Sequence, residues 1–354
     1  MPLAARRTLR ATLTESWLSR STLTWLLWPA SLLYGAAVHV RHWLYACGAI
    51  AVYRAPVPVV VVGNVAVGGV GKTPVVIEIV RHLRARGFRP GVLSRGYGRR
   101  TGPGSAAVCA VTAASDPAEA GDEPAMIHRA TGAPVFVASA RSRAASALLA
   151  THADTDVLVC DDGLQHYALA RDVEVCVFDD RGIGNGFQLP AGLLREAWPR
   201  TPPPGVRMLV LHTGNSPAFA GFRAYRTIAQ HACDAHGTVV PFDVLRAAPL
   251  CAVAGIGQPQ IFFDALRSQG LRLERVEALP DHADFSIWTN PCGTNRRLVC
   301  TEKDAVKLWR THPQALAVPL HVRLDDAFWD AFDQALQEAS LSSGPALEIP
   351  HREP

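Results

Sequence analysis

The chain has 354 residues, of which 49% are hydrophobic and 19% are charged. This length and composition predict more than one buried core, so two globular domains are expected. The formal net charge is only +4, and the sequence has no long lysine or arginine run and no basic stripe interleaved with aromatic residues. Nucleic acid is therefore excluded as the default partner. The eight cysteines are scattered without a Cys-x-x-Cys pair, which predicts free thiols and argues against structural zinc.

Residues 22–40 contain no Asp, Glu, Lys or Arg, and arginines flank them on both sides. The length is sufficient for a helix that spans a membrane. Trp25, Trp28 and Pro29 instead favour a helix that lies in the headgroup region of one leaflet, and this is our interpretation. A transmembrane span, a buried helix of an ordinary core and a secretory signal are the alternatives. The signal is the weakest of these, because a small-residue cleavage site is poorly matched.

Short apolar, β-branched runs alternate with helical stretches from residue 58 onward. This alternation predicts an α/β fold with a doubly wound, mostly parallel sheet. The runs expected to form strands are 58–62, 91–94, 135–138, 157–160, 173–178 and 208–211, and the expected helices are 74–86 and 141–151.

A second, smaller α/β lobe is expected after residue 215. Its predicted strands are 251–256 and 297–300, and its predicted helices are 259–269, 303–310 and 325–338. Small residues, Gly and Pro dominate 102–121, which indicates a surface loop. The expected organisation is a membrane-anchoring helical segment (1–50), an α/β domain (51–215), the C-terminal lobe (216–340) and a disordered tail (341–354).

Residues 63–73, Gly-Asn-Val-Ala-Val-Gly-Gly-Val-Gly-Lys-Thr, stand between a predicted strand and a predicted helix, as a phosphate-binding loop requires. Glycines allow the backbone N–H groups to wrap around phosphate oxygens, Lys72 reaches the β and γ oxygens, and Thr73 ligates Mg²⁺. The loop belongs to the Gly-Gly-x-Gly-Lys-Thr variants. The residues expected to contact the nucleotide are Ala66, Val67, Gly68, Gly69, Val70, Gly71, Lys72 and Thr73.

A carboxylate at the end of a neighbouring buried strand is needed to hold the metal ion in phosphoryl transfer. The apolar run 157–160 ends in Asp161 and Asp162. Seen alone, such a pair is more often a turn, but beside a phosphate loop it predicts a Mg²⁺ site. The spacing leaves open which aspartate binds the ion directly.

Several further motifs occur in a fixed order along the chain. They are Gly63-Asn64, Gly68-Gly-Val-Gly-Lys-Thr-Pro74, Ser94-Arg-Gly-Tyr-Gly98, Gly121-Asp-Glu-Pro124, Asp161-Asp-Gly-Leu-Gln-His166, Leu189-Pro-Ala-Gly-Leu-Leu-Arg-Glu196, Pro280-Asp-His282 and Thr301-Glu-Lys-Asp304. With this ordered set the sequence resembles the tetraacyldisaccharide 4'-kinase family, the lipid A 4'-kinases of Gram-negative bacteria. The resemblance implies that residues 51–215 form a P-loop kinase domain with a fold of the P-loop NTPase type. It extends from the N-terminal segment to about residue 310, and its two departures, Val70 and Leu193, affect side chains that the chemistry does not need.

The resemblance implies an enzyme that uses ATP and Mg²⁺ to phosphorylate the 4'-hydroxyl of a tetraacyldisaccharide 1-phosphate, giving lipid IVA in lipid A biosynthesis. An acceptor with four acyl chains stays in the bilayer, so the enzyme must come to it. The expected location is the cytoplasmic face of the inner membrane. The expected partners are the lipid precursor and an anionic membrane surface, with no nucleic acid and no protein partner.

The resemblance also implies roles for individual side chains. Asp122 resembles the family's base, with His282 placed to orient it, and without the resemblance these are a loop carboxylate and an ordinary histidine. Arg95 and Arg195 are candidates to clamp the γ-phosphate or the substrate's 1-phosphate, because a guanidinium matches phosphate geometry, although each could be a solvated arginine. The expected catalytic set is Asp122, His282, Lys72 and Arg95, and Arg195, Gln165 and His166 are expected near the substrate.

Two other classes of function compete with the kinase. A membrane-associated switch ATPase or GTPase shares the loop, but such proteins often carry a signature lysine at the position of Val67. Residues 301–304 are similar to the guanine-reading motif of GTPases, yet Glu302 stands where that motif has lysine. A nonenzymatic scaffold with a vestigial nucleotide fold is disfavoured by the intact Lys72 and Thr73.

Overall fold

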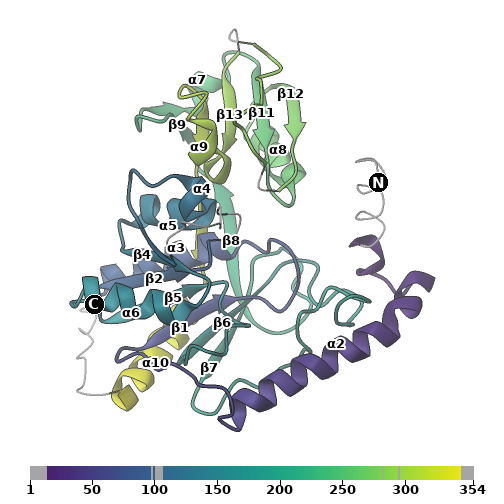
Figure 1. Cartoon of the computed structure of the whole chain (residues 1–354). Coiled ribbons are helices and arrows are strands. Elements are labelled where there is room, and N and C mark those ends of the chain that lie inside the picture. The colour runs from purple at the N-terminus through teal and green to yellow at the C-terminus, as the bar shows by residue number, and fades with distance from the viewer. Residues whose placement is uncertain (1–13, 97–98, 100–106, 282, 294–295, 344–354) are drawn as a thin grey trace. The chain divides into compact units, whose positions relative to one another are not determined.

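The computed structural model describes residues 14–96, 99, 107–281, 283–293 and 296–343 (Figure 1). These residues divide into two compact units, which are described separately below. The first unit contains the described residues up to Lys72, Asp156–Ala224 and the described residues from Leu324 onward. The second contains Thr73–Thr155 and Tyr225–Arg323. The predicted domain boundaries stay a prediction.

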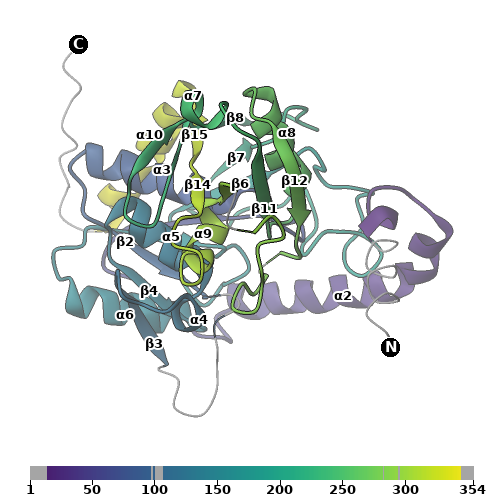
Figure 2. The same cartoon turned by 90° about the horizontal axis from the view of Figure 1, so that it is seen from above.

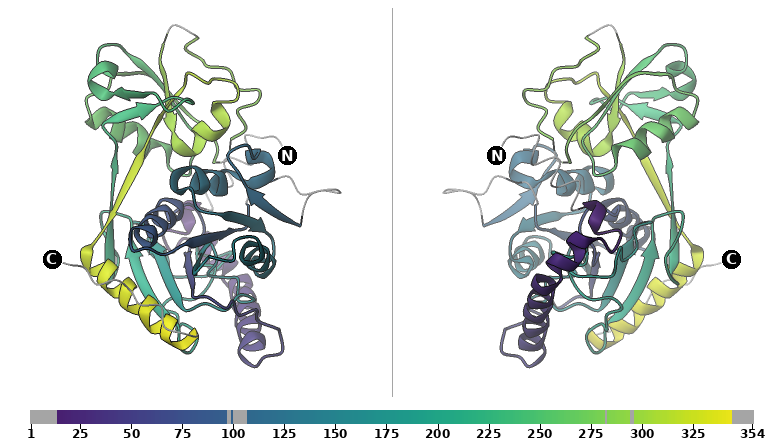
Figure 3. Two further views of the ribbon diagram at one scale, coloured as in Figure 1. Left: turned by 90° about the vertical axis from the view of Figure 1, so that its left-hand side faces the viewer. Right: turned by 90° about the vertical axis from the view of Figure 1, so that its right-hand side faces the viewer.

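Four parallel strands form the centre of the first unit. Their order is β7-β6-β1-β5, and β8 begins beside β7, also in parallel. Every residue of β1, β5 and β6 is buried, as expected of parallel strands covered on both faces. The C-terminal helix α10 packs on β6 and β7 and is yellow in Figure 3. The bounds are β1 Val59–Gly63, β5 Val157–Asp161, β6 Val173–Phe178, β7 Arg207–His212, β8 Phe222–Ile228, β15 Leu320–Leu324 and α10 Asp326–Ser343.

The N-terminal apolar segment forms one long helix, α2 (Thr22–Ala46), which begins with a capping box between Ser21 and Thr24. It is long and apolar enough to cross a membrane, and only 11% of its apolar window is buried. Its buried residues are Thr24 and Ser31, whereas tryptophans and leucines are exposed. A core helix would bury its apolar residues and expose its polar ones, so the alternative of a buried core helix is wrong.

A group of buried charged side chains surrounds Glu174 on β6 in the first unit. Glu174 on β6 is fully buried, and its two carboxylate oxygens lie 3.3 Å from Arg171 Nη1 and 2.9 Å from Arg200 Nη1. Arg200 Nε also lies 3.6 Å from Glu196 Oε2, which accepts a 2.6 Å hydrogen bond from the Tyr167 hydroxyl. Each buried charge is therefore compensated by a partner of opposite sign.

Replacing Glu174 by glutamine should reduce the free energy of unfolding by about 3–5 kcal/mol, because two largely buried arginines would lose their counter-charge. Denaturant unfolding followed by circular dichroism measures this. The control is Glu338→Gln, which removes the exposed partner of Arg207 and should cost about 1 kcal/mol or less. Equal losses in the two variants would contradict the assignment.

The second unit contains a smaller set of strands that continue the α/β pattern. β2 pairs with β4 in parallel and β4 pairs with β3 antiparallel. The predicted loop at 102–121 is partly wrong, since its described residues include the short strand β3 and the short helix α4. Neither is long or apolar enough to show a period in the sequence. The bounds are β2 Pro90–Ser94, β3 Val108–Val111, β4 Val135–Ala138, α3 Lys72–Ala85, α4 Pro117–Ala120, α5 Asp122–Thr131 and α6 Arg141–Thr151.

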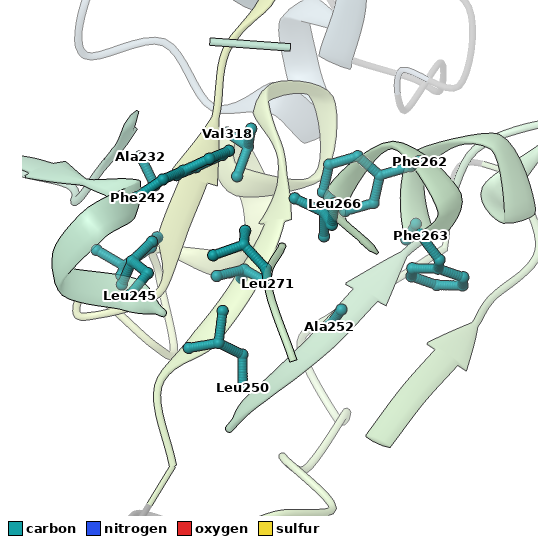
Figure 4. Packing of buried hydrophobic residues seen from close by; sticks show 13 residues of the cluster. Ala232, Phe242, Leu245, Leu250, Ala252, Phe262, Phe263, Leu266, Leu271 and Val318 are labelled. Atoms are coloured by element: carbon teal, nitrogen blue, oxygen red, sulfur yellow. The ribbon is translucent and has the colours of Figure 1, made fainter. Parts of the chain in front are cut away.

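A six-stranded sheet with the order β10-β9-β14-β13-β11-β12 forms the rest of the second unit. β14, β13, β11 and β12 are parallel, and β9 joins β14 antiparallel. Phenylalanines of α7 and α8 pack with apolar residues of the sheet in one core cluster (Figure 4). The bounds are β9 His231–Cys233, β10 Val239–Pro241, α7 Phe242–Leu245, β11 Leu250–Ala254, α8 Pro259–Ser268, β12 Leu273–Ala278, β13 Leu298–Thr301, α9 Glu302–Leu308 and β14 Leu316–Val318.

The cysteines differ from the expectation at one pair. All eight lie in the described part of the chain; six have free thiols, and Cys251 is bonded to Cys292. These two come from β11 and from a loop far along the sequence, so no local spacing could indicate the bond. Residues 341–343, which were expected in the tail, belong to α10, which continues to Ser343. Residues 344–354 lie outside the described residues.

Candidate active site

The phosphate loop connects β1 to α3, as the sequence predicts. β1 ends at Gly63 and α3 begins at Lys72. Gly68 and Gly71 adopt φ values of 105° and 80°, which side chains rarely tolerate, so glycine is required at both positions. Thr73 follows in the first turn of α3 and is buried.

Lys72 is held between an amide and a carboxylate. Its Nζ donates a 3.0 Å hydrogen bond to Asn64 Oδ1 and lies 3.4 Å from Asp162 Oδ1. Asn64 is fully buried at the start of the loop, and its own amide donates to the Ala66 carbonyl. Asn64 and Asp162 therefore hold the ammonium group at the loop.

The two candidate metal ligands lie at the carboxyl end of β5. Val62 is in register with Asp161, which places this aspartate beside the start of the phosphate loop. Asp161 is almost completely buried, whereas the Asp162 carboxylate is about one-third exposed and its backbone φ is 48°. A buried strand that ends in this pair fits a Mg²⁺ ion held by one or two carboxylates together with substrate phosphates.

A cage of three or more His, Cys, Asp or Glu side chains for a metal does not occur among the residues that the structure describes.

The predicted substrate residues of the first unit meet at Asp162. Arg195 Nη1 lies 3.4 Å from Asp162 Oδ1 and donates to Gln165 Oε1 at 3.2 Å. The Gln165 amide donates to the Asn64 carbonyl at 3.0 Å. Lys72, Asp162, Arg195 and Gln165 are thus brought together around Asn64. His166 follows in the next turn, and its carbonyl accepts a hydrogen bond from Arg171.

The segment before Arg195 connects the phosphate loop to α2. The Arg195 N–H donates to the Val65 carbonyl at 2.6 Å, and the Val67 N–H donates to the Leu193 carbonyl at 2.8 Å. On its other side the same segment accepts hydrogen bonds from α2, where Tyr34 donates to the Arg195 carbonyl at 3.0 Å and Ser31 donates to the Gln188 carbonyl at 2.8 Å.

Two loop-contacting side chains were not predicted from the sequence. Asn64 belongs to a motif of the resemblance, and its position directly after a buried strand was an available signal. Arg181 Nη1 donates to the Val67 carbonyl at 3.1 Å, while its guanidinium lies 2.9 Å from Asp179 Oδ2. No spacing relates Arg181 to the loop, so the sequence gives no signal for it.

The second unit carries the candidate base. Asp122 is the first residue of α5, and its carboxylate is only 8% exposed. Lys307 of α9 places its Nζ 2.6 Å from Asp122 Oδ2, and Lys303 of the same helix lies 2.9 Å from Asp281 and 3.6 Å from Glu123. The helices α5 and α9 lie side by side (Figures 1 and 2).

Arg95 directly follows β2 and is exposed, so its phosphate contact stays a prediction. His282 lies outside the described residues. In the guanine-reading motif the last aspartate would bind the nucleobase. Asp304 is instead buried and accepts a hydrogen bond from the Gly255 N–H at 2.9 Å, as a structural residue would.

The fold and the loop define a P-loop nucleotide-binding protein with a mostly parallel α/β sheet. The profile described as LpxK: Tetraacyldisaccharide-1-P 4'-kinase matches residues 23–337, so this chain belongs to the tetraacyldisaccharide 4'-kinase family. The predicted family and fold class are thereby confirmed.

Individual relatives agree with this placement. The chain is 54% identical over 345 residues to a tetraacyldisaccharide 4'-kinase of Acidovorax sp. (strain JS42), covering 97% of each chain. It is 50% identical over 336 residues to that of Polaromonas sp. (strain JS666), covering 94% of this chain and 98% of the relative. The crystal structure of LpxK from Aquifex aeolicus in complex with ATP matches with a TM-score of 0.75 and 27% identity, covering 90% of this chain and 99% of that chain.

Proposed function

We propose that this chain transfers the γ-phosphate of ATP to the 4'-hydroxyl of a tetraacyldisaccharide 1-phosphate, giving lipid IVA. The observation that supports the proposal best is the position of Lys72. Its ammonium group lies beside Asn64 and Asp162 on a glycine loop between β1 and α3. Such a cation stabilises negative charge that develops on the transferred phosphoryl group. The family membership supplies the acceptor.

The phosphate loop and the residues around it would bind and orient the nucleotide. The backbone of residues 66–71 would surround the phosphates, and Lys72 would contact the β and γ oxygens. Thr73 with Asp161 or Asp162 would hold Mg²⁺, which would offset the negative charge of the phosphates. Arg195, held by Asp162 and Gln165, would bind a phosphate of the nucleotide or the acceptor.

Residues of the second unit would accept the proton that the hydroxyl loses. The acceptor hydroxyl loses its proton as the new O–P bond forms, and Asp122 would take it, with His282 as its orienting partner. Arg95 would add a further phosphate contact.

The rate of ADP release with and without the lipid acceptor separates this proposal from the switch ATPase. A kinase should release ADP at a rate that rises at least tenfold when tetraacyldisaccharide 1-phosphate in detergent is added, because productive attack requires the bound hydroxyl. Release at the same rate without acceptor would support the ATPase and contradict the kinase.

The exposed apolar side chains of α2 support a membrane location. We propose that α2 lies in the interfacial region of the cytoplasmic leaflet, with Trp25, Leu26, Leu32 and Leu33 toward the lipid. The buried polar residues Thr24 and Ser31 face the protein. Anionic lipids would add attraction through the arginines that flank the helix.

Replacing Leu33, which is 76% exposed, by glutamate should weaken binding to anionic vesicles at least about tenfold. A buried leucine contributes about 1.5–3 kcal/mol, and each 1.4 kcal/mol corresponds to about tenfold in affinity. Vesicle sedimentation measures this. The control is Ile287→Glu, which changes an 89% exposed isoleucine of the second unit. If the two variants bind vesicles equally well, α2 is not the lipid-binding surface.

A further inference from the structure

Lysine is almost absent from this chain. Of 35 basic residues only three are lysines, Lys72, Lys303 and Lys307, and all the others are arginines. Lysine carries a compact ammonium, whereas arginine carries a broad planar guanidinium, so the two are not interchangeable at a close contact. Lys72 belongs to the phosphate loop. The other two occur on one short helix, α9. Lys303 belongs to the motif 301–304 and Lys307 follows one turn later, and the proposed mechanism leaves both without a role.

Lys307 contacts the candidate base directly. Its Nζ lies 2.6 Å from Asp122 Oδ2 and donates a 3.0 Å hydrogen bond to the Ala283 carbonyl. The side chain of Lys307 is one-fifth exposed, and that of Asp122 is less exposed still. The carboxylate is therefore held in one orientation by a cation with little access to water, where charge interactions are stronger than at a surface.

Lys303 joins the two chain segments that flank the predicted catalytic pair. Its Nζ lies 2.9 Å from Asp281, the residue before His282, and 3.6 Å from Glu123, the residue after Asp122. Burial disfavours the charged form of Lys303, but Glu123 and Asp281, with a further contribution from Asp122, raise the pKa of Lys303 above its ordinary value. The ammonium therefore persists throughout the neutral range.

The helix that carries both lysines is itself fixed at its start. Thr301 caps α9 by accepting the Asp304 N–H, and its hydroxyl donates to Asp304 Oδ2 at 2.7 Å. Asp304 in turn accepts the N–H of Gly255, just beyond the end of β11. A Cβ at Gly255 would lie 2.9 Å from Asp304 Oδ1, so glycine is needed for this approach. These contacts hold the first turn of α9, the helix that carries Lys303 and Lys307.

We propose that Lys307 is a positioning residue for phosphoryl transfer, which holds the Asp122 carboxylate ionised and oriented, while Lys303 links Glu123 to Asp281. The proposal rests on the proposed function, in which Asp122 accepts the proton of the acceptor hydroxyl. In that step the acceptor oxygen bonds to the γ-phosphorus, the bond from this phosphorus to the β–γ bridging oxygen breaks, ADP leaves, and the proton moves to Asp122.

The ionised form of Asp122 is favoured by Lys307 and Lys303 of α9 and disfavoured by Glu123 of its own helix and by Asp281. His282 lies outside the described residues. A neighbouring cation favours the charged state of a carboxyl group. Removing the Lys307 charge should therefore move the acidic limb of the kcat/KM profile to higher pH.

The test compares Lys307→Met, Lys307→Gln and Lys307→Arg in the full-length enzyme, assayed with ATP and the lipid acceptor from pH 5 to 9. We expect Met and Gln to lower kcat roughly 10- to 100-fold through misplacement of the base, to shift the acidic limb upward and to change the KM for ATP less than threefold. Arg should restore the acidic limb. Gln keeps a donor for the Ala283 carbonyl and serves if the Met variant does not fold. The control is Arg310→Met, which removes an exposed partner of Asp116 and should change neither quantity.

A double mutant distinguishes the failure of this inference from failure of the proposed function. If Lys307 acts through Asp122, adding Lys307→Met to Asp122→Asn should cause little further loss of kcat. Multiplicative losses, or an unchanged acidic limb in an active enzyme, would overturn the positioning role. An unmodified enzyme that leaves the lipid unphosphorylated would instead refute the proposed function itself.

Discussion

Replacing Lys72 by methionine should lower kcat by at least about 10²–10³-fold, the loss typical of removing one preorganised donor at developing negative charge. Methionine has a similar length and no charge. Asn64 and Asp162 would lose the ammonium that lies 3.0 and 3.4 Å from their oxygens. Lys72→Arg should not restore activity, because a guanidinium is broader than the position between these two side chains.

The measurement is steady-state kinetics with ATP and the lipid acceptor, together with circular dichroism to confirm folding. The matched control is Arg81→Met on the same helix, which removes an exposed ion pair with Glu78 and should keep kcat within about twofold, as exposed pairs contribute little. A folded Lys72→Met enzyme with unchanged kcat would contradict the role of the loop.

Replacing Asp122 by asparagine should lower kcat by about 10²–10⁴-fold, the usual contribution of a positioned general base. Asparagine keeps the shape and a hydrogen-bond acceptor for Lys307 but does not accept the proton. Because proton acceptance by Asp122 stabilises the transition state and not the bound ATP, the KM for ATP should change little.

Asp116→Asn is the matched control for this substitution. Asp116 is a partly exposed carboxylate near the start of α4 that pairs with Arg310 at 2.9 Å. We expect its kcat to match that of the unmodified enzyme. An Asp122→Asn enzyme that turns over at the same rate as Asp116→Asn would show that another group accepts the proton.

The central strands of the first unit could be predicted because each is buried on both faces. A strand such as β6, in which all six residues are buried, reads as a nearly continuous apolar run. The strands that were not predicted are short or partly exposed. β12, for example, is mostly exposed and has three charged residues among its six, Glu274, Arg275 and Glu277, so its sequence lacks a distinctive period.

The phosphate loop could be predicted because all its parts are consecutive in the sequence. Contacts between distant segments could not. Arg181 reaches Val67, Lys307 reaches Asp122 and Cys251 bonds to Cys292, and each pair is joined by the fold rather than by a local spacing. Helix α5 was also missed, although Asp122, Glu123 and Pro124 in its first turn are typical of a helix N-terminus.

The most direct test of the kinase activity is transfer of ³²P from γ-labelled ATP to detergent-solubilised tetraacyldisaccharide 1-phosphate by the full-length chain. We expect a labelled bisphosphorylated lipid with the new phosphate on the 4'-oxygen, and loss of the label with Lys72→Met and with Asp122→Asn. Consumption of ATP while the lipid stays unlabelled would contradict the kinase activity.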